Sequence, residues 1–233
     1  MKKTLLFLLA TAGLTLQTFG QGQLVFANTA TASTHIWTNS TASTGTGTGA
    51  QIAGAGSYVF ALFYNSTTNS GTTAGVSASA TPWNTAGWTL VDGSGYATNT
   101  ASTGRITGLV SPLFTSISAL ASGTYANLEV IGWNTEGGTV NTLSDFETAY
   151  AHALALTQGT ISGLMYGNSS VASILLGNNV LPLNSNVFGT NPGQITGFTL
   201  GQVLGTAPVP EPGTMALAAL GGASLFLFRR RKA

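Results

Sequence analysis

Short apolar runs, separated by glycine, asparagine and threonine, make up most of this chain. In the clearest run, residues 57–65, polar and apolar positions alternate at first, but apolar residues occupy both sets of positions. This content predicts a strand that is buried on both faces. Further strands are predicted at residues 23–28, 88–92, 105–110, 125–133, 161–165, 171–176 and 195–200. Strands at this spacing, with glycine and asparagine in the turns, predict a mainly β fold, an antiparallel β-sandwich.

One segment departs from the β pattern. Ser144 and Glu147 have the spacing of a capping box at the start of a helix. The residues that then recur at helical spacing are Phe146, Ala149, Tyr150 and Ala153. This stripe predicts one short helix over about residues 145–156, on the rim of the sheet. Trp133, at the end of an apolar strand, is predicted to belong to the core.

Two segments carry little apolar pattern. Residues 29–56 are rich in threonine, serine, glycine and alanine, and residues 65–81 have a similar composition. The first segment predicts a flexible loop or a weak edge strand. No period of self-similarity indicates a repeat architecture.

The two ends of the chain are apolar and cationic. Lys2 and Lys3 precede an apolar stretch and small residues, the pattern of a secretory signal peptide over residues 1–20, with cleavage after Gly20 or, as the alternative, after Gly22. Residues 213–228 form a second apolar run that as a helix would cover about 24 Å. This predicts a C-terminal transmembrane helix, because the arginines that follow can reach the membrane interface.

Charge is distributed very unevenly along the chain. Six of its seven lysines and arginines lie in the end segments, and Arg105 is the one cation of residues 21–207. Cations at both ends favour the cytoplasmic side for both, so residues 21–207 are predicted to form one extracytoplasmic domain. The carboxylates of this domain are Asp92, Glu129, Glu136, Asp145 and Glu147, so its net charge is −4. A domain with one cation is not expected to bind nucleic acid.

The composition narrows the chemistry further. The chain has no cysteine, which excludes disulfides, thiolate catalysis and cysteine metal sites. Its hydroxyl and amide side chains supply the solvation that most soluble proteins obtain from charge. That composition suits a polar matrix of sugar chains, and it is also typical of secreted β proteins of low charge.

The last residues form an ordered motif. Pro210, Glu211 and Pro212 come directly before the apolar run, and a basic cluster follows it, formed by Arg229, Arg230, Arg231 and Lys232. Over residues 209–233 this order resembles the PEP-CTERM sorting signal. The resemblance implies that residues 208–233 are a sorting and anchor segment, and that Pro210, Glu211 and Pro212 are recognised by an exosortase-type membrane protease. The basic cluster would stop the segment on the cytoplasmic side.

Residues with catalytic chemistry are few. Asp145 and His152 are seven positions apart, so they share a helix face but stand roughly 10 Å from each other along the axis. That spacing favours a solvated helix surface, and neither a metal site, a cofactor site nor a catalytic residue is predicted. Trp83 and Trp88 flank a turn-like segment and form a possible platform for stacking on sugar rings.

These observations predict a protein exported by the secretion machinery and trimmed by signal peptidase. It would be held transiently in the inner membrane, then passed to the cell surface or an exopolysaccharide matrix. Its expected role is structural or adhesive, and not enzymatic. The alternatives are a carbohydrate-binding module of the matrix, or a secreted polysaccharide hydrolase that uses two scattered carboxylates such as Glu129 and Asp145.

Overall fold

The computed structural model describes residues 21–28, 32–42, 49–91, 95–108, 114–177 and 186–207. The predicted signal peptide, residues 1–20, and the predicted sorting segment, residues 208–233, lie outside the described residues. No helix among the residues that are described is both long and apolar enough to cross a membrane.

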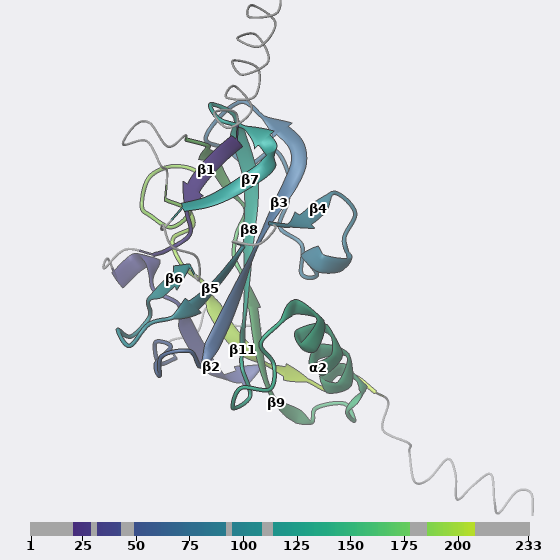
Figure 1. Cartoon of the computed structure of the whole chain (residues 1–233). Helices are drawn as coiled ribbons and strands as arrows, with labels where there is room; N and C mark the ends of the chain where they lie inside the picture. Colours follow the sequence, from purple (N-terminus) through teal and green to yellow (C-terminus); the bar gives the residue numbers. More distant parts are fainter. Residues whose placement is uncertain are drawn as a thin grey trace, which may run out of the picture.

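A curled, nine-stranded sheet forms most of the body, and a two-stranded sheet packs against one of its faces (Figure 1). The path of the large sheet is β2 (Trp37–Ala42), β11 (Thr199–Leu204), β9 (Ile161–Asn168), β8 (Tyr125–Asn134), β3 (Tyr58–Asn69), β5 (Tyr96–Asn99) and β6 (Ile106–Gly108). Off this path, β10 (Ala172–Leu175) pairs with β8 and β4 (Trp88–Leu90) pairs with β3. The small sheet joins β1 (Gln21–Val25) to β7 (Phe114–Ala121). Two short 3-10 turns, η1 (Ala32–Thr34) and η2 (Pro82–Asn84), and one helix, α2 (Leu143–Ala155), complete the described elements.

The two central strands carry the core of the molecule. β3 and β8 run antiparallel, from the pair Tyr58 and Asn134 at one end to the pair Asn69 and Tyr125 at the other. Phe60 and Leu62 enter the core between the two sheets, and alternate residues of β3 enter a second core below the helix. The prediction of a strand buried on both faces is therefore confirmed.

The second core is aromatic and holds the helix against the sheet. Trp133 is fully buried, as predicted, and its indole N–H donates to the carbonyl of Val140 at 3.0 Å. The ring of Phe146, on α2, stacks on Trp133 with centroids 4.8 Å apart. A ring of this size buried on both sides contributes several kcal/mol of stabilisation, on the order of 3–5.

The helix begins two residues earlier than the sequence predicted. The capping box is formed by Thr142 and Asp145, and not by Ser144 and Glu147. The Asp145 N–H lies 3.2 Å from the Thr142 hydroxyl, and the Thr142 N–H lies 3.1 Å from the Asp145 carboxylate. Both residue pairs have the spacing of a capping box, so the local pattern alone could not choose between them. The earlier start follows from the tertiary anchor at Val140, which fixes the chain just before Thr142.

Other differences lie at weakly patterned segments. β2, at the edge of the large sheet, is the edge strand that the prediction for residues 29–56 allowed. β5 and β7 were missed, because threonine, serine and alanine fill much of their sequence. Within the part of the chain that the structure describes, the mainly β fold with one helix is confirmed. Neighbouring named strands of the sheet run antiparallel, except that β11 runs parallel to β2. These two strands lie about 160 positions apart in the sequence, so no hairpin signal predicts their pairing.

Candidate functional site

The described chain ends at a point that the fold holds firmly. Beyond β11, the Thr206 N–H donates to the Leu154 carbonyl at 2.9 Å, and the Ala207 N–H donates to the Leu156 carbonyl at 3.0 Å. The Gln158 N–H returns a bond of 2.7 Å to the Ala207 carbonyl. The next residue in the sequence is Pro208, which has no N–H for a further bond of this kind.

This attachment requires a glycine. A Cβ at Gly205 would lie 2.3 Å from the Leu156 carbonyl oxygen, which is closer than real contacts allow. The Gly205 N–H donates to Thr160 at 2.9 Å, so both sides of the turn after α2 bind the last described residues. The last described residue, Ala207, therefore lies beside the C-terminal end of α2.

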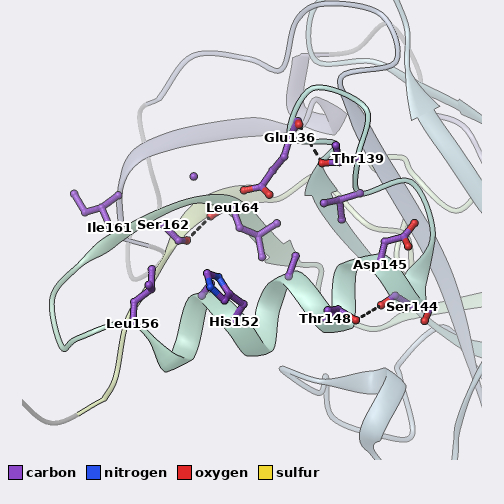
Figure 2. A pocket seen from close by; sticks show the side chains of 14 residues that line it. Glu136, Thr139, Ser144, Asp145, Thr148, His152, Leu156, Ile161, Ser162 and Leu164 are labelled. Carbon is purple, nitrogen blue, oxygen red and sulfur yellow. Dashed lines mark hydrogen bonds between the residues drawn. The ribbon is translucent and has the colours of Figure 1, made fainter.

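A groove of about 720 Å³ lies next to this attachment point, between α2 and β9. Its polar lining includes Glu136, Asp145, His152 and Ser162, and its apolar lining includes Leu156 and Leu164. Figure 2 shows the side chains of Glu136 and His152 directed toward the space between the helix and the strand. Exposed Ile161 lines the same groove, with 58% of its surface accessible.

The groove gathers three of the titratable residues considered from the sequence, Glu136, Asp145 and His152. Asp145 and His152 share a face of α2, as predicted, and both line the groove. The Thr142 hydroxyl and N–H hold the pKa of the Asp145 carboxyl below its ordinary value, so this carboxylate serves the helix cap. Within the described ranges, no three histidine or acidic side chains come together as a metal site would need.

Glu129 lies far from solvent. Its exposed fraction is 0%, and its carboxylate accepts bonds from the Ser79 N–H at 2.9 Å and from the Asn168 amide at 3.0 Å. Burial raises the pKa of Glu129, and these two donors oppose that shift in part. The side chain thus ties the segment around Ser79 to the face of β8.

Trp83 and Trp88, the predicted sugar platform, are half-buried and pack against the second core. The Trp83 ring meets Phe146 edge-on, with centroids 5.1 Å apart, and meets Tyr150 and Tyr166 in the same way at 5.6 Å. Trp83 therefore takes part in the packing of α2. Sugar binding by the solvent-exposed parts of the Trp83 and Trp88 rings stays a prediction.

The residues of the predicted sorting signal, Pro210, Glu211, Pro212 and the basic cluster, lie outside the described residues. Residues 208–232 match the family model of the PEP-CTERM protein-sorting motif. The chain thus carries a PEP-CTERM sorting domain, and the resemblance found in its sequence is confirmed. The motif implies export, a C-terminus anchored in the membrane before cleavage, and processing by exosortase, a membrane protein. No curated protein and no solved structure matches the chain.

Sequence reasoning did not find the groove beside α2. Its walls come from the turn after β8, from α2 and from β9, which only the fold brings together. One local signal was present: Glu136, Gly137 and Gly138 follow one another, and all three have positive φ. Two consecutive glycines after an apolar strand indicate a sharp turn, but not the surface against which it packs.

Proposed function

We propose that this protein is a non-enzymatic, structural or adhesive component of the cell surface or of an exopolysaccharide matrix. The observation that carries the proposal is the match of residues 208–232 to the sorting motif, placed directly after a folded body. In this account residues 21–207 are the cargo. The residues beyond them direct its delivery.

The proposal assigns a role to each part of the tail. Pro210, Glu211 and Pro212 form the element that exosortase recognises, since prolines on both sides of Glu211 keep the backbone extended as a protease cleft requires. Residues 213–228 span the inner membrane before processing. Arg229 and the three residues after it hold the far end on the cytoplasmic side.

The placement of Glu129 and Asp145 supports a role without catalysis. Glu129 is buried beneath the segment at Ser79, and Asp145 is bound within the cap of α2. A glycosidase would need two carboxyl groups facing one accessible cleft, about 5–9.5 Å apart. Glu129 has no access to such a cleft, so a pair that includes Glu129 does not suit that reaction.

The sorting assignment is tested by replacing Pro210, Glu211 and Pro212 together with alanine. The variant should accumulate in the membrane fraction, while the unaltered protein is released. A matched control replaces Gln158 and Thr160 with alanine, because both are exposed and lie beside the attachment point. Equal release of the triple variant and the control would refute the assignment.

A carbohydrate-binding role in the matrix is the second candidate. The observation that favours it is the pair Trp83 and Trp88, whose rings retain some accessible surface next to a neutral, hydroxyl-rich segment. Polysaccharide pull-down with both tryptophans changed to phenylalanine, and then to leucine, tests this site. Binding that persists in the leucine variant would remove the pair from the site.

A further inference from the structure

A second hollow, of about 390 Å³, lies between the end of β3 and the turn that joins β7 to β8. It arises from a change in strand register. Asn65 pairs with Asn127, but the next pair along the ladder is Asn69 with Tyr125, so three residues of β3 oppose one residue of β8. A bulge of this kind bends its strand and redirects side chains, and bulges are over-represented at sheet edges and next to active sites.

Hydrogen bonds from asparagines hold the bulge in one shape. The Thr67 N–H donates to the Asn65 side chain at 2.9 Å, and the Thr67 carbonyl accepts from the Asn127 amide at 2.9 Å. The Asn69 amide donates to Asn127 at 3.0 Å and to the Ser173 hydroxyl at 2.6 Å. Because these groups are already fixed, little ordering is needed when a ligand binds.

The lining of the hollow is neutral and combines apolar surface with hydroxyl groups. Leu120 and the half-buried ring of Tyr125 give it apolar surface, and none of the described residues that line it is charged. The hydroxyls of Thr67, Ser70 and Tyr125 make no hydrogen bond with another described residue, so they are available to a ligand. The volume falls within the range of small-molecule sites, about 300–1,000 Å³.

From these features we infer that the hollow is a binding site for a neutral saccharide. An ionised ligand would lose hydration there without gaining a partner of opposite charge. A pyranose ring has an apolar face, which suits Tyr125 and Leu120, and hydroxyl groups on its edge, which suit the free hydroxyls of the lining. This site is distinct from Trp83 and Trp88, which lie on the face of the sheet covered by α2.

The position of the hollow suits a protein held by its C-terminus. β8 is ten residues long, and it runs from Tyr125 at the hollow to Asn134 near the start of α2. At about 3.3 Å per residue the strand separates these two ends of the body by about 30 Å. Figure 1 shows α2 and the last described residues at the end opposite to the tip of β3. The claim that the hollow faces away from the membrane, where it can reach a ligand, rests on the proposed function. The other features of the site do not depend on it.

The test is calorimetric titration of the purified exported protein with neutral tetrasaccharides of glucose, mannose and galactose, and with a tetrasaccharide of galacturonic acid. We expect one or more neutral probes to bind and the acidic probe to bind more weakly. Thr67→Val and Tyr125→Phe each remove one hydroxyl, and each should weaken binding by about two- to tenfold. Ala119→Trp should abolish binding, because Ala119 is exposed and lines the hollow.

The matched control is Thr89→Val, which removes an exposed hydroxyl on β4, outside the hollow. It should bind as the unaltered protein does, and thermal unfolding of every variant shows whether the fold is kept. The inference is overturned if no neutral probe binds, if Ala119→Trp binds normally while folded, or if the acidic probe binds best. Each of these results leaves the sorting assignment standing, whereas normal release of the alanine triple variant would overturn that assignment and not this site.

Discussion

The titration of Glu129 depends on its buried position. Because burial raises its pKa, the native state keeps the proton at pH values where the unfolded chain has already released it. The stabilisation from Glu129 is thus complete below the ordinary glutamate pKa, and it is lost as the pH rises from there through the raised pKa of the native state. Above that second value no further loss occurs.

We therefore predict that the free energy of unfolding falls as the pH rises from ~4 through this window, and that Glu129→Gln removes the fall because glutamine does not ionise. Urea denaturation of the wild type and of Glu129→Gln, repeated across this pH window, measures the free energy of unfolding. Glu147→Gln, at an exposed position of α2, is the control and should keep the wild-type profile. Profiles of the same shape for the wild type and Glu129→Gln would contradict the assignment.

The start of α2 also depends on single residues. Thr142→Ala removes the hydroxyl that caps Asp145 and should lower the free energy of unfolding by about 1 kcal/mol. Ser144→Ala removes the hydroxyl that the sequence had favoured, and should change stability much less. Chemical denaturation of the two variants measures the difference. A larger loss of stability for Ser144→Ala than for Thr142→Ala would mean that Ser144 caps the helix, as the sequence predicted.

One aromatic side chain of the helix, Phe146, is fully buried against the sheet. Phe146 stacks on Trp133 and meets the edge of Trp83. Phe146→Ala should cost about 3–5 kcal/mol of stability, and near-ultraviolet circular dichroism should show loss of the tryptophan signal. Glu147→Ala, one position along the helix and exposed, serves as the control. A loss below about 1 kcal/mol would mean that α2 is fixed mainly by other contacts.

The sequence predicted elements in proportion to the strength of their local pattern. The apolar run within β3, the strand ending at Trp133 and the stripe of α2 were all recognisable, because each buries apolar side chains at a regular period. β7 was not, since its buried positions alternate with serine and alanine. The parallel pairing of β2 with β11, the groove beside α2 and the bulge at Thr67 depend on contacts between distant segments, which periodicity does not encode.

At the scale of the whole molecule, the chain divides into a folded body and two end segments of different chemistry. The body contains one cation and is closed at Ala207 by hydrogen bonds to the end of α2. All the other cations lie in the end segments. Removal of both ends would therefore leave a domain with a net charge of −4, whose solubility depends largely on hydroxyl and amide groups.

The intact mass of the protein recovered outside the producing cells tests the central claim most directly. The account predicts a chain that begins at Gln21, or at Gln23 if cleavage follows Gly22, and that lacks the basic residues 229–232. Any additional mass would report attached sugar. Recovery of the complete 233-residue chain from the cytosol, with neither end removed, would contradict the account.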